Sequence, residues 1–352
     1  MKILLNGIGR IGKSILRLSN SSNLEIVAIN ELNQNIENIA YLINYDSTYG
    51  KLADKFEVVE NHFIKNSTNK IQILNHHTLD TIDYKALEID IIIDASGQPQ
   101  KKELLEQLDV KAIFLTHPSS EADINIVLGA NEEKLQTTHK IISTSSCNAS
   151  ALLPFLKLID DNYKIVSGDI VTIHPLLNHQ KTLDSKCISS SDRDVKCNFE
   201  FGRSSTQNII PSKTTTIEAC GYIFPEFNSA LISSSSLRVA MPTVGAINVV
   251  LNVEKNLTLD ELNALLEKEE EHQQYDIFKN IKEPLVSSDF QGEVFSTIID
   301  GKFTKITNNN MIKALIWYDN EYGYASKVVE IVNKYIMLKS THQQNQQKGS
   351  KA

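Results

Sequence analysis

Two side chains near the middle of the chain could form a nucleophile and its base. Cys147 follows the apolar run 140–144 and precedes a helical pattern over 149–160. At the N-terminus of a helix a thiolate is stabilised, so a lowered pKa is expected for this cysteine. His174 ends a strand-like run and could supply the imidazole that takes the thiol proton. Taken alone, the pair also fits a small buried thiol and a histidine that only forms hydrogen bonds.

A glycine-rich turn near the N-terminus predicts a dinucleotide site. The apolar run 2–6 leads into Gly7, Gly9 and Gly12, spaced as G-x-G-x-x-G, and a helical pattern follows. Glycines there let the backbone approach a pyrophosphate at a helix N-terminus. Glu31 follows Gly12 by nineteen residues and would accept hydrogen bonds from ribose hydroxyls while repelling a 2′-phosphate. NAD is therefore favoured over NADP; the alternative is a turn that serves only tight packing.

The elements that must position these residues fall into two groups. Strand-like runs at 2–6, 24–29, 89–94, 112–116 and 140–144 alternate with helical patterns such as 102–108. This alternation predicts an α/β fold with a parallel, doubly wound Rossmann sheet in residues 1–146. Beyond it, β-rich runs with few helices between them predict an α+β catalytic domain over 147–319 with a mixed or antiparallel sheet. Those runs lie at 169–174, 237–254, 294–299 and 313–318, and Ser233 to Ser236 is expected to form a loop before a strand.

Composition narrows the class of protein. The chain has 352 residues, 22% of them charged, and a formal net charge of −8, which argues against a nucleic-acid or membrane-surface binder. No apolar run reaches the roughly 18–20 residues of a membrane-spanning helix. Four cysteines without a C-x-x-C pair predict no metal site and a reducing cytoplasm. The polar residues 341–352 are expected to form a disordered tail.

Seven sequence blocks, in order, resemble the glyceraldehyde-3-phosphate dehydrogenase family along nearly the whole chain. They are NGIGRIG at 6–12, YDSTYGKL at 45–52, STSSCN at 143–148, QKTLD at 180–184, QNIIPSKT at 207–214, RVAMPT at 238–243 and WYDNEYGYASKVV at 317–329. The resemblance implies NAD as cofactor, a phosphorylated aldehyde as substrate and a homotetramer. It also implies that a C-terminal helix over 320–338 completes the NAD-binding domain.

The resemblance implies roles for individual residues. Cys147 matches the nucleophile that forms a thiohemiacetal and then a thioester, and His174 matches its base. Arg238 matches the arginine that binds the substrate phosphate, and Ser146, beside the nucleophile, is expected to contact the substrate. The remaining cofactor contacts that the resemblance implies are Arg10 and Ile11 at the pyrophosphate, Ser96 beside the adenosine half, Asn320 at the nicotinamide carboxamide and Tyr324 next to it.

The pattern departs from the family where phosphate groups would bind. Leu177 and His179 stand where threonines are usual, and Asn148 replaces the threonine after the nucleophile. Thr214 is kept, but Thr215 replaces a glycine. The segment 181–207 is longer than the family loop by roughly eight residues and carries Cys187 and Cys197, expected to be free thiols rather than a zinc site or a disulfide.

The altered run after His174 favours the erythrose-4-phosphate dehydrogenase branch of the family, and so do the runs 29–32, 116–120 and 157–161, whereas Asn148 and the enlarged loop match neither branch. That branch is similar in mechanism but tends to hydrolyse its thioester. The predicted activity is NAD-dependent oxidation of a phosphorylated aldose, either erythrose 4-phosphate or glyceraldehyde 3-phosphate. Two alternatives stay open. One is a phosphorylating, glycolytic glyceraldehyde-3-phosphate dehydrogenase; the other is a divergent NAD-binding regulatory protein without turnover.

Overall fold

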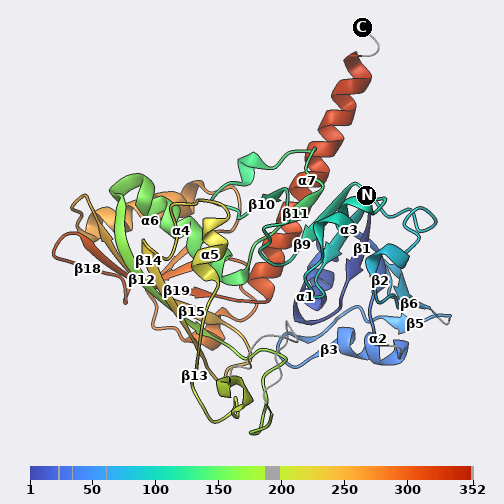
Figure 1. Ribbon diagram of the computed structural model, residues 1–352, viewed down its shortest axis with the longest axis horizontal. Helices are drawn as coiled ribbons and strands as arrows, with labels where there is room; N and C mark the ends of the chain where they lie inside the picture. Colours follow the sequence, from blue (N-terminus) through green and yellow to red (C-terminus); the bar gives the residue numbers. More distant parts are fainter. Residues whose placement is uncertain (23, 34, 61, 187–198, 350–352) are drawn as a thin grey trace. The chain divides into compact units, whose positions relative to one another are not determined.

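The computed structural model describes residues 1–22, 24–33, 35–60, 62–186 and 199–349 (Figure 1). The chain divides into two compact units. Unit 1 contains Met1–Ser146 and the segment from Tyr324 onward, so it is built from both ends of the sequence. Unit 2 contains Cys147–Gly323.

Unit 1 is built on a nine-stranded sheet that is parallel over most of its width. In sheet order its strands are β10 (Ile124–Asn125), β11 (Ile141–Ser143), β9 (Ala112–Leu115), β8 (Ile91–Asp94), β1 (Lys2–Asn6), β2 (Glu25–Asn30), β7 (Lys70–Leu74), β6 (Phe63–Lys65) and β5 (Glu57–Val58). All pairings from β10 to β7 are parallel, whereas β6 and β5 add an antiparallel edge. The predicted α/β fold with a parallel Rossmann sheet is confirmed.

Burial on both faces explains why the central strands of unit 1 are almost entirely apolar. Leu4, Ile92 and Ile113 belong to one core cluster and are 0% exposed. Parallel strands covered by helices on both sides have such continuous hydrophobic sequences. The other elements of the unit are α1 (Arg10–Ser19), α2 (Ile36–Asn44), α3 (Lys102–Gln107), α7 (Tyr322–Gly349), the short helices η1 (Leu79–Thr81) and η2 (Glu132–Lys134), and the hairpin strands β3 (Tyr45–Asp46) and β4 (Gly50–Lys51).

The C-terminal helix α7 lies beside β9 and β11 within unit 1 (Figure 1). Val328, Val332 and Tyr335 are buried on its inner side, and the Tyr335 ring contacts Phe114 of β9 edge-on at 5.5 Å. The helix continues to Gly349, past residue 338 where its end is predicted and into the segment 341–352 expected to be disordered. Glutamine and lysine are good helix formers and no proline interrupts them, so the backbone continues without an apolar stripe.

Unit 2 is built on an eight-stranded mixed sheet, as predicted. In order its strands are β13 (Ile210–Ser212), β14 (Ile232–Arg238), β12 (Ile165–His174), β15 (Gly245–Val253), β19 (Met311–Tyr318), β17 (Thr297–Asp300) and β16 (Phe278–Ile281), with β18 (Lys305–Thr307) also paired to β19. The pairs β12–β14 and β16–β17 are parallel and the others antiparallel. Its helices are α4 (Cys147–Tyr163), α5 (Thr216–Gly221), α6 (Leu259–His272), η3 (Phe199–Gly202) and η4 (Ser287–Phe290).

One expectation for unit 2 is wrong. Ser233 to Ser236 form part of β14 rather than a loop, whereas the β-rich run 237–254 contains the end of β14 and all of β15. Serine has little β-propensity, but here parallel pairing with β12 holds the segment extended, and Ser233 and Ser235 point to the exposed side. Tertiary pairing therefore overrides local preference.

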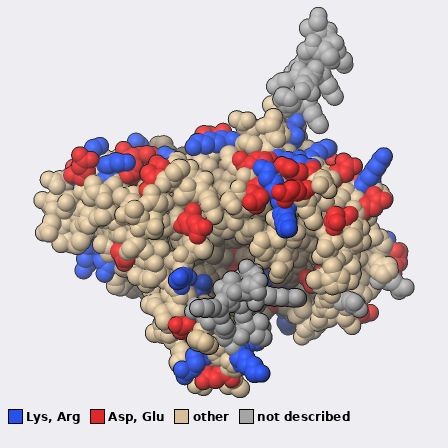
Figure 2. Space-filling model, in the orientation of Figure 1, with Lys and Arg blue, Asp and Glu red and all other residues tan. Residues whose placement is uncertain are grey.

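Charged side chains of both signs are interspersed over the face drawn in Figure 2. In the described part of the chain, no helix is both long enough and apolar enough to cross a membrane.

Candidate active site

The glycine turn of unit 1 has three glycines with three different constraints. Gly7 has φ +89°, and a Cβ there would lie 2.8 Å from the Cα of Ser96. A Cβ at Gly12 would lie 2.1 Å from the carbonyl oxygen of Gly7. At Gly9, which caps α1, no atom lies within 4 Å of such a Cβ. Gly7 and Gly12 are thus required by packing, whereas Gly9 leaves the approach to the α1 N-terminus open for a ligand.

Glu31 borders a cavity of about 310 Å³ next to this turn. Its carboxylate accepts hydrogen bonds from the backbone N–H groups of Ile8 at 3.0 Å and Asn33 at 3.1 Å. The carboxylate is therefore held at the glycine turn, as the dinucleotide interpretation requires. The cavity is lined by Asn6, Gly7, Gly9, Asn30, Glu31, Leu32, His76, His77, Leu79, Ala95, Ser96, Gln98 and Gln100.

A buried polar network beneath the cavity was not foreseen from the sequence. Asn6 donates to Asp94 at 2.9 Å, and Asn30 donates to the side chain of Asn6 at 2.8 Å. Asn30 also exchanges hydrogen bonds with the backbone of His76, and Asp94 accepts from the backbone N–H of Ser96. Each of the three network residues is the last residue of a parallel strand. Polar residues at the ends of predicted strands were the feature of the sequence from which this network could have been predicted.

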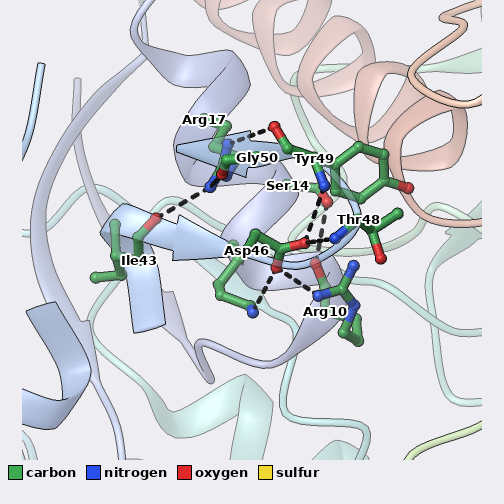
Figure 3. A network of polar contacts seen from close by, with 9 residues as sticks. Arg10, Ser14, Arg17, Ile43, Asp46, Thr48, Tyr49 and Gly50 are labelled. Carbon is green, nitrogen blue, oxygen red and sulfur yellow. Dashed lines mark hydrogen bonds and ion pairs between the residues drawn. The ribbon is translucent and has the colours of Figure 1, made fainter. Parts of the chain in front are cut away.

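Arg10, in the first turn of α1, is held by a buried carboxylate (Figure 3). Its Nη1 lies 2.5 Å from Asp46 Oδ2, and Lys13 Nζ lies 2.7 Å from the same oxygen. Burial by itself raises the pKa of Asp46, but hydrogen bonds from Arg10, Lys13 and the backbone of Tyr49 and Thr48 outweigh it and hold that pKa well below its ordinary value. Asp46 is therefore an anion that keeps two cations beside the helix N-terminus. Ile11 lies in the same helical turn.

Cys147 and His174 come together in unit 2, as the sequence predicts. Cys147 begins α4, His174 ends β12, and 3.8 Å separates Sγ from Nε2. The other ring nitrogen, Nδ1, lies 2.9 Å from the carbonyl oxygen of Pro175. A carbonyl only accepts, so Nδ1 carries the hydrogen and Nε2 presents its lone pair to the thiol. This is the tautomer that a general base requires.

The expectation of a lowered thiol pKa is wrong for this state of the molecule. Burial raises the pKa of Cys147 to about 11, although the charge of Arg238 and backbone N–H groups act in the opposite direction. Burial and then the charge of Arg238 lower the pKa of His174 to about 3. Desolvation outweighs the helix N-terminus here, because the helix effect is a partial charge whereas burial removes the whole hydration of the thiolate. The resting pair is a neutral thiol and a neutral imidazole.

Arg238 is the cation of this site. It ends β14, directly opposite His174 in the parallel register. Its Nε and Nη1 are buried and have no hydrogen-bond partner within the described residues. Unpaired buried guanidinium donors are costly, and an anion would satisfy them.

The residues at which the sequence departs from the family differ in their burial and in their hydrogen bonds. The amide of Asn148 is bonded to Tyr318 and Thr216, and Thr214 contacts the hydroxyl of Thr216 at 2.6 Å. Thr215 is exposed, and Leu177 is partly buried and offers no polar side-chain atom. His179 is exposed and its ring stacks on Phe201 at 5.9 Å.

Asn320 is held in a fixed orientation. Its Oδ1 accepts from the backbone N–H of Val244 at 3.0 Å and from Thr243 at 3.1 Å, leaving the amide Nδ2 to donate elsewhere. Val244 has φ +68°, an unfavourable conformation for a β-branched residue, and such strain is often found at functional sites.

In unit 1, Tyr324 is buried and holds the backbone that precedes the nucleophile. Its hydroxyl contacts Thr144 and donates to the carbonyl of Ser145, both at 2.9 Å. Ser146 follows and is half-buried. The sequence had indicated Tyr324 only as a neighbour of the nicotinamide.

The extended segment 181–207 is described at its two ends. The ends are joined. The backbone N–H of Ser205 donates to the carbonyl of Lys181, the Ser204 hydroxyl donates to the carbonyl of Thr182, and Arg203 pairs with Asp184. Cys187 and Cys197 lie outside the described residues, so the prediction of free thiols stays a prediction. Within the described ranges, no group of three or more His, Cys, Asp or Glu side chains could hold a metal ion.

Together these features define a class of protein. A Rossmann sheet with a glycine turn and an acid after its second strand, joined to a mixed-sheet unit with a cysteine–histidine pair, is the arrangement of an NAD-dependent dehydrogenase.

Comparison with known proteins gives the family. Residues 1–102 match the NAD binding domain of glyceraldehyde 3-phosphate dehydrogenase, and residues 146–320 match its C-terminal domain. The glyceraldehyde-3-phosphate dehydrogenase of Salmonella typhimurium is 32% identical over 338 residues, covering 94% of this chain and 98% of that protein. That of Priestia megaterium is 31% identical over 344 residues, covering 96% of this chain and 99% of that protein. The chain belongs to the glyceraldehyde-3-phosphate dehydrogenase family, and its cofactor is NAD.

Proposed function

We propose that the protein oxidises a small phosphorylated aldose, erythrose 4-phosphate or glyceraldehyde 3-phosphate, with Cys147 as nucleophile and His174 as base. One observation carries the proposal: Cys147, His174 and the unpaired guanidinium of Arg238 belong to one site in unit 2. A thiol and a base suit attack on an aldehyde, and a buried cation suits the phosphate at the other end of the same substrate.

Four residues are proposed to hold NAD. The open space at Gly9 admits the pyrophosphate, Glu31 accepts from the adenosine ribose, and Ser96 borders the same cavity. Asn320, whose Oδ1 is already engaged, offers its Nδ2 hydrogens to a carboxamide oxygen. When bound, NAD supplies the acceptor for the hydride that leaves the substrate carbon.

The chain's own residues handle the protons. Nε2 of His174 takes the proton of the Cys147 thiol as the C–S bond forms, and this proton neutralises the former aldehyde oxygen to give a thiohemiacetal. The same nitrogen then takes the hydroxyl proton as the thiohemiacetal is oxidised to a thioester. Attack by an oxygen nucleophile breaks the C–S bond, and the thiolate recovers a proton. Arg238 lies opposite His174, so its charge also favours the thiolate during attack.

We propose water rather than inorganic phosphate as that nucleophile. The amide of Asn148 and the hydroxyls of Thr214 and Thr216 are bonded to one another or to Tyr318. Leu177 adds no hydrogen-bond donor in its side chain. A second phosphate would have to displace these internal hydrogen bonds, and each displacement weakens its binding.

The test is NADH formation with each aldose phosphate, with and without inorganic phosphate. We expect turnover with at least one substrate that does not depend on phosphate. Activity that requires phosphate would instead identify a phosphorylating, glycolytic enzyme. NAD binding without turnover of either aldose would identify a regulatory NAD-binding protein.

Variants assign the roles. Cys147→Ser should abolish turnover and His174→Asn should lower kcat by about 10²–10⁴-fold, while both still bind NAD. Cys220→Ala is the matched control, because Cys220 is a buried thiol of the same unit in α5 and should be dispensable. Unchanged turnover in Cys147→Ser would refute the assignment.

Family membership also supports a homotetramer, which we include in the proposal. Light scattering coupled to size-exclusion chromatography would test it.

A further inference from the structure

Asn148 directly follows the proposed nucleophile, and both polar atoms of its side chain form hydrogen bonds. It is the second residue of α4 and is 9% exposed. Its Oδ1 accepts from the Tyr318 hydroxyl at 2.5 Å, and its Nδ2 donates to Thr216 at 3.0 Å. A third contact goes to the nucleophile itself: Cys147 Sγ lies 3.6 Å from the same Oδ1.

Tyr318 is fixed in its place by the sheet. It ends β19 and is 2% exposed, and burial holds its pKa well above the ordinary value, so the phenol remains a donor. Its partner in the neighbouring strand β15 is Gly245, where a Cβ would lie 2.5 Å from the tyrosine ring and hydroxyl. Glycine at 245 therefore makes room for the ring that holds the Asn148 amide.

The Cys147 thiol consequently has one proton and two acceptors. Oδ1 of Asn148 lies 3.6 Å from the sulfur, and Nε2 of His174 lies 3.8 Å from it. Nε2 is a lone-pair nitrogen, because Nδ1 faces the Pro175 carbonyl. An S–H can point to only one of them, and rotation about the Cβ–Sγ bond exchanges the two.

We infer that Asn148 is a positioning residue: its Oδ1 accepts the Cys147 S–H in the resting enzyme, competes with His174 for that proton, and so delays formation of the reactive thiolate. This inference rests on the proposed role of Cys147 and reassigns Asn148, predicted from the sequence to bind substrate. Accepting from the thiol stabilises the neutral form, and a carbonyl dipole beside the sulfur disfavours its anion.

The charged and titratable groups facing the thiol come from four other places. They are His174 of β12, Arg238 of β14, Tyr318 of β19 and Glu321 just before α7. Arg238 favours the thiolate, whereas Glu321 opposes it. A substitution at position 148 leaves His174, Arg238 and Glu321 in place but removes the acceptor of the Tyr318 hydroxyl. Tyr318→Phe is therefore the background in which the substitutions are compared, and the shift in reactivity should persist there if the amide causes it.

The experiment measures alkylation of Cys147 by iodoacetamide between pH 6 and 10, followed by mass spectrometry of the peptide that contains Cys147. Iodoacetamide is neutral, so Arg238 does not attract it, and no aldose is needed. Asn148→Ala and Asn148→Leu both remove the acceptor, and Leu keeps the branched shape of the side chain and excludes water. We expect both to react about 3- to 10-fold faster than the wild type at pH 7, the effect of one hydrogen bond lost by the thiol.

Asn148→Asp is the matched control, because it keeps the volume and an acceptor while adding a charge that disfavours the thiolate. It should react no faster than the wild type. Acceleration in Ala alone would show that water entry, not loss of the acceptor, is responsible, and would overturn the inference. No acceleration in Ala or Leu, or acceleration in Asp, would also overturn it. Asp tests the inference if the other two do not fold, and aldose turnover tests the proposed function separately.

Discussion

At the scale of single residues, the site holds its reactive groups uncharged and places one unpaired cation beside them. Burial keeps the thiol of Cys147 and the imidazole of His174 neutral, and Arg238 has buried donors that lack a partner in the described chain. An arriving anion would satisfy those donors. The arrangement therefore suits a substrate whose phosphate binds Arg238 while its carbonyl carbon meets the sulfur.

His174 should make the folded protein sensitive to acid. Its pKa is about 3 in the folded chain, against about 6.5 when unfolded. Between these two values the unfolded chain binds a proton that the folded chain does not, so stability falls as the pH is lowered from about 6.5 towards 3. His174→Asn removes this titration. From pH 7 to pH 4.5 the free energy of unfolding should therefore fall by on the order of 2 kcal/mol less in this variant than in the wild type.

Urea denaturation of both proteins at pH 7 and pH 4.5 would measure this difference. Acid also protonates Asp46 and other carboxylates, but their contribution is common to both proteins and cancels. Equal losses of stability in wild type and variant would show that His174 is not held neutral by burial.

At the scale of elements, the turn between β1 and α1 combines packing and binding in three glycines. A Cβ at Gly12 collides with the Gly7 carbonyl, whereas a Cβ at Gly9 meets no atom within 4 Å. Gly12 is therefore needed for the fold, whereas Gly9 faces the space proposed for the cofactor. Gly9 also has φ −68°, so it does not occupy the left-handed region that favours glycine.

This contrast predicts opposite effects for two identical substitutions. Gly9→Ala should leave thermal stability nearly unchanged but raise the Kd for NAD by about tenfold or more, because its methyl group occupies the pyrophosphate approach. Gly12→Ala should lower the free energy of unfolding by about 1–3 kcal/mol or prevent folding, since a backbone atom must move. Calorimetric titration with NAD and thermal melts measure both. Equal NAD affinity in Gly9→Ala and wild type would contradict the assignment of that space.

At the scale of the whole chain, unit 1 is completed by residues more than 170 positions away from its sheet. Tyr335 of α7 is 0% exposed, contacts Phe114 edge-on, and donates to the carbonyl of Lys111 at 3.1 Å. The NAD-binding unit is therefore complete only when the chain segment that follows unit 2 is present. Sequence order and spatial order differ here, as in any chain whose ends meet in one core.

Tyr335→Ala should consequently destabilise the NAD-binding unit by about 3–5 kcal/mol, because it leaves a cavity in a closed core. Tyr335→Phe keeps the ring and should cost about 1 kcal/mol, the value of its hydrogen bond. Denaturation of each variant, measured as the loss of NAD binding, would report on the stability of unit 1 directly. If Tyr335→Ala were as stable as Tyr335→Phe, the helix would contribute little to that core.

The sequence by itself determined what depends on local pattern. The G-x-G-x-x-G turn with Glu31, the alternation of strands and helices, and Cys147 at a helix start are all periodicities or spacings within a few dozen residues. They predicted the fold, whereas the pairing of Cys147 with His174 was predicted only through the resemblance of the seven blocks to the family. The sequence did not predict the polar network of Asn6, Asn30 and Asp94, the strand at Ser233, or the hydrogen bonds of Asn148. Those depend on which strands become neighbours.

Only the tertiary structure decided the charge state of the site. A helix N-terminus predicts a lowered thiol pKa, but burial raises it to about 11, because the cost of desolvation depends on everything packed around the sulfur. Likewise, Asn148 is a threonine substitute in the sequence and a partner of Tyr318, Thr216 and Cys147 in the fold. Electrostatics and hydrogen bonding act through space, and two of these partners, Thr216 and Tyr318, are more than sixty positions from Asn148 along the chain.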